Sequence, residues 1–489
     1  MNSLLKILYS KCCLCALLMM AAIPASAQLQ LTLNKTIALA QDSALQALSA
    51  QQNLAMAKTS YDEFMAGRKI NLSASASPAY SYKSIDRTTS ASSLSEYNQL
   101  TTALTLKLTQ QVNSFGGNFY ALSSLSNDLY LGQMREHYNN VYGTSMQFQV
   151  MPIMLGYQQD ILGYNPFKWE KKLQDYRITT QEQQYAYELA QVAESAVGYF
   201  FQYACNKAYY EMYRQNVEVA DSLYKIGQQK YNIMAINKAE LISLELQLLN
   251  SQNSLFSYEK ELSNSRASLL SFLGIPLDTE VDIVLPQAPP QLIITEDEVI
   301  RLAQENNPSL RSHQESIILA EQEVDLARRE SGFHTSVDLS VGGQNYANTF
   351  VDAYANTRFS TSVGVTFSVP IIDMGRARLR VAKARQNLDL QQLNLQEAQR
   401  TLRDEISIAL RDFNLAQQQL SQTERTVALA DASFELNQYN YAQGLCDIST
   451  FTFAQQRKDE AHNNYISALR GYWTSYYKLC RLTIHDFRK

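Results

Sequence analysis

The feature that most constrains the fold is an internal repeat. When the chain is shifted by 210 residues, its second half aligns with its first without gaps over more than 100 positions. Tyr231 then meets Tyr441, and Leu269 meets Leu479. Identical residues are sparse in this alignment, but the spacing of apolar residues is the same in both copies. A duplication of this length indicates a fold built from two similar units in tandem.

Each copy predicts the same order of elements: a helix, a region of strands, a very long helix, a tight turn and a return helix. In the first copy the expected ranges are 33–65 for the helix, 169–230 for the long helix, 231–237 for the turn and 238–272 for the return helix. In the second copy they are 296–330, 377–440, 441–447 and 448–483, with strands at about 335–370. The first repeat therefore spans 28–274 and the second 295–489, joined by a proline-rich linker at 275–294.

The long helices carry the spacing of a coiled coil. In the second copy, eight apolar residues follow one another at intervals of three or four: Leu395, Ala398, Leu402, Ile406, Ala409, Phe413, Ala416 and Leu420. This is mostly the 3.5-residue repeat that packs the seam of one helix against its neighbours. Low counts of Gly (17) and Pro (10) in 489 residues also favour long, uninterrupted helices.

Three expected helix starts carry capping patterns. Asn237 lies three residues before Glu240, and the 210-residue shift places Asp447 three residues before Thr450 in the same way. Asn and Asp are favoured N-cap residues, and a Glu three positions later can return a bond to the cap. Thr295 is expected to open the second repeat with a similar capping box.

Strand-like alternation marks the region before the second long helix. From Phe359 to Val369 every second residue is apolar except Thr361, and the residues between are small or polar. This pattern is typical of a barrel strand with one face towards lipid and the other towards water. A half-buried strand of a soluble sheet gives the same alternation, so the strands alone leave both alternatives open.

The first repeat contains additional material before its long helix. Within residues 98–131, apolar and polar residues alternate from Thr102 to Leu108, Gly116-Gly117 predicts a turn, and residues 120–131 predict a returning strand. We interpret them as a hairpin inserted in the outward loop, with two additional barrel-wall strands as the alternative.

The N-terminus has the features of an export signal. Two lysines precede a short apolar run at 12–23, and Ala25-Ser26-Ala27 forms a cleavage site before Gln28. The run is shorter than the roughly 20 residues of a spanning helix. We therefore expect a signal peptide at 1–27 and an exported chain in the periplasm, the outer membrane or the exterior. Cysteines next to the apolar run leave a lipoprotein as the alternative.

No pattern of catalytic or metal-binding residues stands out. A formal net charge of −5 argues against nucleic-acid binding, which usually needs a basic surface. The five histidines are scattered, and Cys205, Cys446 and Cys480 are odd in number and far apart. We expect no enzyme activity, no cofactor and no metal site.

The segment that ends the last strand and opens the second long helix points to a family. Residues 370–380 (PIIDMGRARLR) resemble the strand-to-helix junction of the TolC-type outer-membrane efflux proteins. Residues 159–169 look like the variant of this junction in members from Bacteroidetes-like bacteria. Tyr441-Ala-Gln-Gly444 resembles the family's second helical turn. With the repeat and the order of elements, the resemblance covers essentially the whole mature chain.

The resemblance implies an α+β membrane protein that works as a homotrimer. Four strands from each chain would close a twelve-stranded transmembrane β-barrel, and the antiparallel coiled-coil helices would form a periplasmic α-barrel. The expected function is an outer-membrane exit duct of a tripartite efflux or type I secretion system. Such a duct passively conducts substrates from a periplasmic adaptor protein and an inner-membrane pump. Oligomerisation also follows from physical chemistry, because open strand edges are not tolerated in lipid.

Two other classes of protein contain long helices of this kind. A periplasmic adaptor carries one helical hairpin, lipoyl-like β-modules and usually an inner-membrane anchor, whereas this sequence predicts two hairpins. A structural coiled-coil protein of the periplasm should lack the strand pairs. Both stay alternatives to the duct.

The resemblance also assigns roles to the two turns, which in the family form the closed periplasmic end. By position, Glu240 and Tyr441 match gate residues, and Asp447 lies beside them. Thr450 and Phe453 stand where some members have an acidic ring. Adaptor contacts are implied at the apolar turn residues, which are Met234, Ala235, Ile236, Gly444, Leu445 and Cys446. The alternatives are helix capping alone for Glu240 and Asp447, and packing of each turn against its neighbour.

Overall fold

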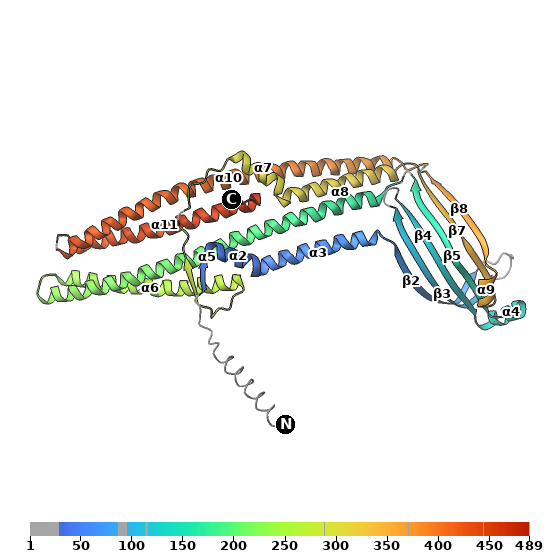
Figure 1. Cartoon of the computed structure of the whole chain (residues 1–489), viewed down its shortest axis with the longest axis horizontal. Helices are drawn as coiled ribbons and strands as arrows, with labels where there is room; N and C mark the ends of the chain where they lie inside the picture. The colour runs from blue at the N-terminus through green and yellow to red at the C-terminus, as the bar shows by residue number, and fades with distance from the viewer. Residues whose placement is uncertain are drawn as a thin grey trace, which may run out of the picture. The chain divides into compact units, whose positions relative to one another are not determined.

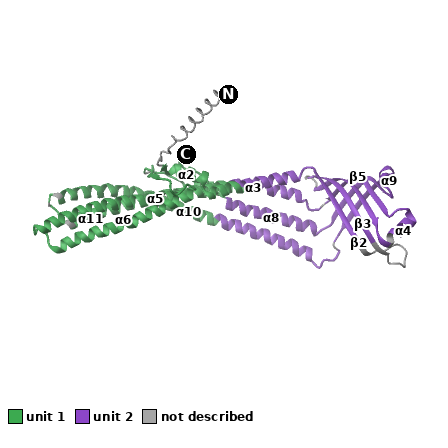
Figure 2. Cartoon of the chain, turned by 90° about the horizontal axis from the view of Figure 1, so that it is seen from below, with its two compact units in different colours: residues 1–53, 183–307, 400–489 green, residues 54–182, 308–399 purple. Residues whose placement is uncertain are grey.

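The computed structural model describes residues 29–86, 95–112, 116–161, 163–287, 289–369, 371–443 and 445–488. The expected signal peptide at 1–27 and the turn residue Gly444 lie outside the described residues. The chain forms two compact units, which are coloured separately in Figure 2. Unit 1 consists of residues 1–53, 183–307 and 400–489, and unit 2 of residues 54–182 and 308–399.

Two helical hairpins dominate unit 1 (Figure 1). The first is formed by α5 (Pro166–Asn232) and α6 (Lys238–Leu273), and the second by α10 (Arg376–Ala442) and α11 (Ile448–Thr483). α5 and α10 each have 67 residues, and α6 and α11 each have 36. Their bounds are offset by 210 residues throughout, which is consistent with the tandem repeat. Among the described helices, none has the combination of length and hydropathy that crossing a bilayer requires.

Shorter elements complete unit 1. α2 (Leu33–Ser43) and α7 (Glu296–Asn306) occupy corresponding places in the two repeats. β1 (Leu29–Thr32) pairs in parallel with β6 (Val281–Val284). The expected linker therefore contains a strand, and this strand is tied to the start of the first repeat.

The core of unit 1 is formed by large side chains from all four long helices. Fully buried residues include Phe200, Phe201, Leu269, Leu270, Leu273, Ile406, Phe413, Leu469, Tyr472, Tyr476 and Leu479. Along α10, the seam is buried at Leu402, Ile406, Ala409, Phe413 and Leu420. The 3.5-residue spacing therefore identified the packed face of this helix.

Unit 2 contains a six-stranded antiparallel sheet, most of α3 (Leu45–Gly67) and α8 (Pro308–Glu330). The strand order is β2-β3-β4-β5-β7-β8. The strands are β2 (Asn71–Asp86), β3 (Ser95–Val112), β4 (Gly117–Tyr130), β5 (Met146–Ile161), β7 (His334–Ala347) and β8 (Arg358–Ser368). Two short helices, α4 (Gly132–Tyr142) and α9 (Phe350–Ala355), lie in the β4–β5 and β7–β8 connections.

Residues 98–131 differ from our expectation of a hairpin inserted in the outward loop. They form β3 and β4, which lie in the middle of the sheet between β2 and β5. The physical reason is that β3 alternates apolar and polar residues in phase with β2, and β4 pairs along its length with both β3 and β5. Each chain therefore has six strands in this sheet, rather than the four that the resemblance implied.

The helical stretches expected at 33–65 and 296–330 are each divided into two helices. In the second repeat the break falls at Asn307, because Pro308 disfavours a helical conformation of the residue before it. In the first repeat the break falls at Ala44, whose backbone is extended with ψ of 139°. Nothing in the residue types around Ala44 explains this break.

Candidate functional site

The first helical turn, between α5 and α6, exposes apolar side chains. Met234 adopts a left-handed backbone conformation with φ of 58°, and it is 93% exposed. The turn closes through a hydrogen bond of 2.8 Å from the N–H of Ala235 to the carbonyl oxygen of Lys230. Ala235 is exposed, whereas Ile236 is half-buried. Met234 and Ala235 are therefore accessible to a partner, as an adaptor contact requires.

The second turn, between α10 and α11, closes in the same way. The N–H of Leu445 donates to the carbonyl oxygen of Asn440 at 2.8 Å, at positions equivalent to Ala235 and Lys230. Leu445 is 74% exposed, whereas Cys446 is half-buried with its thiol 3.6 Å from the carbonyl oxygen of Asn437. Of the expected contact residues in this turn, only Leu445 is strongly exposed among those described.

Both return helices begin with the capping residues that the sequence predicts. Asn237 accepts a hydrogen bond from the N–H of Glu240, and Asp447 from the N–H of Thr450, each at 2.9 Å. The carboxylate of Glu240 accepts from the side-chain amide of Asn237 at 3.2 Å, rather than from its backbone N–H. The hydroxyl and N–H of Thr450 lower the pKa of the Asp447 carboxyl. These residues therefore cap helices, and their gate role stays a prediction.

An apolar cluster next to the turns joins the two hairpins. Three of its residues are buried, namely Leu223 of α5, Leu244 of α6 and Phe451 of α11. The half-buried residues packed against them are Val219, Tyr224, Phe434 and Tyr441. The ring of Phe451 stacks on Tyr441 at 5.3 Å between centroids and lies 5.6 Å from Phe434. We call these seven residues the tip cluster, which contains side chains from all four long helices.

Tyr441 is the expected gate residue that lies in the tip cluster. Burial raises the pKa of its phenol. The ammonium group of Lys230 lies 5.6 Å from the centroid of its ring, a cation–π contact between the two hairpins. Glu240, in contrast, is exposed and bonded to Asn237. Among the described residues, the two residues matched to the gate thus have different partners, which are Asn237 for Glu240, and Phe451 and Lys230 for Tyr441.

A polar cluster further along α11 links this helix to α5 and α10. Asn216 donates to Asp459 at 2.6 Å and accepts from Gln455 at 2.7 Å. His462 lies 2.9 Å from Asp431. These five residues line a cavity of about 590 Å³ between the three helices. Among the described residues, no three His, Cys, Asp or Glu side chains are arranged to hold a metal ion.

Asp459→Asn should increase the thermal stability of the protein at neutral pH. Burial raises the pKa of the Asp459 carboxyl above its usual value of 3.8, so the folded protein binds this proton more tightly than the unfolded chain. The free energy of unfolding therefore decreases as this carboxyl ionises, which happens as the pH rises from 3.8 through the raised pKa. Asparagine keeps an oxygen for the Asn216 bond without a buried charge. Melting temperatures measured across pH test this.

The exposed Asp412 of α10 supplies the matched control. Asp412→Asn removes the same charge without changing a buried group, so its melting temperature should stay close to that of the wild type. An equal gain in both variants would show that net charge, rather than burial of Asp459, limits stability.

The sequence analysis missed the residues that surround Tyr441. A signal for Phe451 was present, because the buried Ala454 follows it on α11 three residues later, and the buried Ala461 and Ala468 then follow at intervals of seven, as in a coiled-coil seam. The polar cluster had no comparable signal. Asn216 and Asp459 belong to different repeats and lie 243 residues apart in the sequence.

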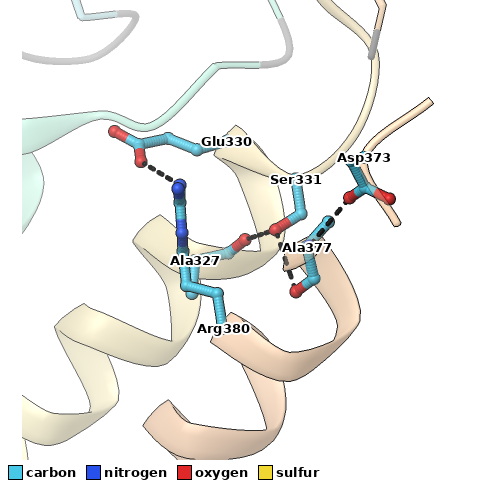
Figure 3. A network of polar contacts seen from close by, with 6 residues as sticks. All are labelled: Ala327, Glu330, Ser331, Asp373, Ala377 and Arg380. Atoms are coloured by element: carbon cyan, nitrogen blue, oxygen red, sulfur yellow. Dashed lines mark hydrogen bonds and ion pairs between the residues drawn. The ribbon is translucent and has the colours of Figure 1, made fainter. Parts of the chain in front are cut away.

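The described part of the junction, residues 371–380, forms a capping turn at the start of α10 (Figure 3). Asp373 accepts hydrogen bonds from the N–H groups of Ala377 and Gly375 at 2.8 and 2.9 Å, which lower the pKa of its carboxyl. Gly375 has φ of 82°, a conformation that favours glycine. Arg380 pairs with Glu330 at the end of α8 at 3.3 Å. The motif thus fixes both the start of α10 and its position against α8.

The six-stranded sheet has one apolar and one polar face. A row of paired residues across the apolar face is Leu72, Leu108, Ala121, Leu155, Val341 and Thr361. The adjacent row on the other face is Asn71, Thr109, Tyr120, Gly156, Ser340 and Ser362. Leu72 and Val363 on the apolar face are each 67% exposed. An exposed apolar face of this extent requires an apolar partner or lipid.

Most of the second repeat matches a known family model, and more than nine-tenths of the chain matches known folds. Residues 299–483 match the family model described as outer membrane efflux protein. The fold is similar to the Campylobacter jejuni CmeC outer membrane channel, with a TM-score of 0.66, 15% identity, and 92% of this chain and 85% of that chain covered. It is also similar to the outer membrane protein VceC from Vibrio cholerae, with a TM-score of 0.63, 13% identity, and 93% and 95% covered.

A third similar structure is the open state of the Neisseria gonorrhoeae MtrE outer membrane channel, with a TM-score of 0.62, 11% identity, and 93% and 89% covered. No curated protein sequence matches the chain significantly.

The predicted resemblance to TolC-type channels is confirmed. The Bacteroidetes-like variant stays a prediction. The matched family is described as an outer membrane efflux protein, which agrees with the expectation that the chain is not an enzyme.

Proposed function

We propose that the protein is an outer-membrane exit duct, because residues 299–483 match the family model described as outer membrane efflux protein and the chain is similar in fold to outer-membrane channels. It serves a tripartite efflux or type I secretion system. Substrates pass through it passively from a periplasmic adaptor and an inner-membrane pump. The chain uses no cofactor for this transport.

The observation that carries the proposal is the separation of the two faces of the sheet. Apolar side chains such as Leu72 and Val363 are exposed on one face, and Ser, Thr and Asn side chains follow one another on the other. A transmembrane barrel needs this division, because its outer face meets lipid and its inner face meets water. In a soluble hairpin protein, the exposed apolar face would be an aggregation hazard.

Assembly as a homotrimer is part of the proposal. Within the described sheet, β2 pairs only with β3, and β8 pairs only with β7. β2 and β8 thus each have one edge of unpaired backbone N–H and C=O groups, and such an edge is not tolerated in lipid. Edge pairing between copies in a head-to-tail manner closes a ring, and the resembled family implies three copies.

We assign the periplasmic gate to Glu240, Tyr441, Asp447 and Thr450, together with the tip cluster. The gate lies where the two hairpins turn, and Tyr441 packs there against Phe451 and Lys230. The exposed side chains of Met234 and Leu445 are the proposed contacts of the adaptor. Capping and gating are compatible for Glu240 and Asp447, because a cap bond uses only part of the carboxylate.

Ion conductance in a planar lipid bilayer tests the duct and the gate together. Wild-type protein should give small channels that rarely open. The double variant Glu240→Ala, Tyr441→Phe should give larger or longer openings, because it removes the carboxylate and the phenolic hydroxyl while retaining the Tyr441 ring stack. Single-channel current and open probability are the measured quantities.

The matched control changes Glu245 and Tyr439, which are exposed residues on the same two helices. Glu245→Ala, Tyr439→Phe should behave as the wild type. Channels unaffected by the gate variant would retain the duct and reduce Glu240 to a helix cap. A protein that needs no detergent and gives no channel would instead favour a periplasmic adaptor or a structural coiled-coil protein.

A further inference from the structure

The two repeats differ in the number of strands. Between the end of α3 at Gly67 and the start of α5 at Pro166 lie 98 residues, whereas 45 lie between Glu330 and Arg376 in the second repeat. The second repeat contributes two strands to the sheet and the first contributes four. β3, β4 and their connections account for the additional length.

β3 and β4 cannot leave the sheet without dividing it. β3 pairs with β2 from Asn71↔Thr109 to Asp86↔Ser95, along the whole of β2. β4 pairs with β5 from Asn118↔Gln158 to Leu129↔Met146. These two strands are the only connection between β2 and β5 in the described sheet. A hairpin standing outside the sheet would leave β2 and β5 paired with each other.

The faces of β3 match those of β2, and β4 follows the same division at Ala121, Leu125 and Leu129. Leu104 and Leu106 of β3 lie on the apolar face and are 53% and 50% exposed. On the opposite face, the hydroxyl of Thr105 lies 3.2 Å from that of Ser124, and Thr101 donates to Asp128 at 2.6 Å. This is the arrangement of a wall strand that meets lipid on one side and water on the other.

The direction of the strands fits closure through further copies of the chain. All five pairings within the sheet are antiparallel. Because the number of strands is even, the two edge strands β2 and β8 run in opposite directions. β8 of one copy can therefore pair antiparallel with β2 of the next, and apolar and polar residues stay on the same faces around the ring.

We propose that all six strands of each chain belong to the barrel wall, so that a trimer closes a barrel of eighteen strands rather than twelve. This inference rests on the proposed function. Three sheets of six strands give eighteen, and barrel diameter grows roughly linearly with strand number. At equal strand tilt, the exit pore is roughly 1.5 times as wide as that of a twelve-stranded barrel. It thus accommodates bulkier cargo at the outer membrane.

Disulfide cross-linking in intact outer membranes tests the inference. The background carries alanine in place of Cys205, Cys446 and Cys480. Two pairs face each other across the strand boundaries that decide the question: Ser75→Cys with Thr105→Cys, and Ser126→Cys with Gln149→Cys. Both pairs should form disulfides on mild oxidation, because directly opposed residues have adjacent Cβ atoms. Ser75→Cys with Leu104→Cys is the control, which should not form a disulfide since the two side chains lie on opposite faces.

A second experiment counts the copies. Ser75→Cys on β2 and Ser362→Cys on β8, joined by a bifunctional maleimide, should give a covalent ladder that ends at the trimer. Both intrachain disulfides together with this trimer support eighteen strands. A conducting, covalent trimer that lacks either intrachain disulfide overturns the inference and retains the proposed function. Protein that neither cross-links between copies nor conducts ions overturns the proposed function itself.

Discussion

Phe451→Ala should cause a large loss of stability in the helical hairpins and raise the open probability of the channel. Phe451 is 3% exposed, and its ring contacts Tyr441 and Phe434. Truncating a buried phenylalanine to alanine costs about 3–5 kcal/mol. The loss falls on the tip cluster, which holds all four helices together at the proposed gate. Thermal unfolding followed by the helical signal, and single-channel recording, measure the two effects.

Phe453 provides a control of the same residue type, two positions away on α11. It is 54% exposed, and its ring lies under the guanidinium of Arg457 at 4.3 Å. Phe453→Ala should therefore change stability by only about 0.5 kcal/mol, as is usual at exposed positions. Equal effects of the two substitutions would mean that burial in the tip cluster does not determine the stability of the hairpins.

The helices were largely predictable because their determinants are local. Apolar spacing located α10, and the caps Asn237 and Asp447 marked the starts of α6 and α11. A capping pattern alone was not sufficient, however. Thr295 occupies the N-cap of α7 without donating or accepting a cap bond through its side chain. Whether a cap side chain bonds depends on its rotamer, which the sequence pattern does not determine.

The sheet was predictable in type but not in extent. Alternation identified the strands and their faces, yet the position of residues 98–131 was left between a loop hairpin and two further strands. An isolated hairpin and two central strands have the same alternation, because the pattern reports the faces of a strand and not its neighbours. Pairing partners such as Ser75 and Thr105 are distant in sequence, so only the structure resolves them.

The proposed gate was the least predictable part. The repeat located both turns, but the packing of Tyr441 against Phe451 and Lys230 depends on how two hairpins meet. The same limit applies to the polar cluster, where Asn216 and Asp459 come from opposite repeats. Periodicity predicts which face of a helix is buried, but it does not predict which residues of another helix cover that face.

Val363→Arg should prevent stable insertion of the protein into the outer membrane. Val363 lies at the middle of β8 on the apolar face and is 67% exposed. An arginine facing lipid near the bilayer midplane costs about 2–4 kcal/mol, and a homotrimer incurs this cost in every chain. Membrane fractionation and the amount of detergent-stable oligomer should both fall sharply relative to the wild type.

The adjacent Ser362 makes this substitution decisive between the proposed duct and its periplasmic alternatives. Its side chain lies on the polar face, paired with Ser340, so Ser362→Arg places the same charge towards water and should leave insertion unchanged. In a periplasmic protein neither face of β8 would meet lipid, and exposed residues on both faces would tolerate arginine to a similar degree. If Val363→Arg prevents insertion and Ser362→Arg does not, one side of the sheet meets lipid and the other meets water. This is the defining property of a barrel wall. Equal tolerance of both substitutions would contradict the duct.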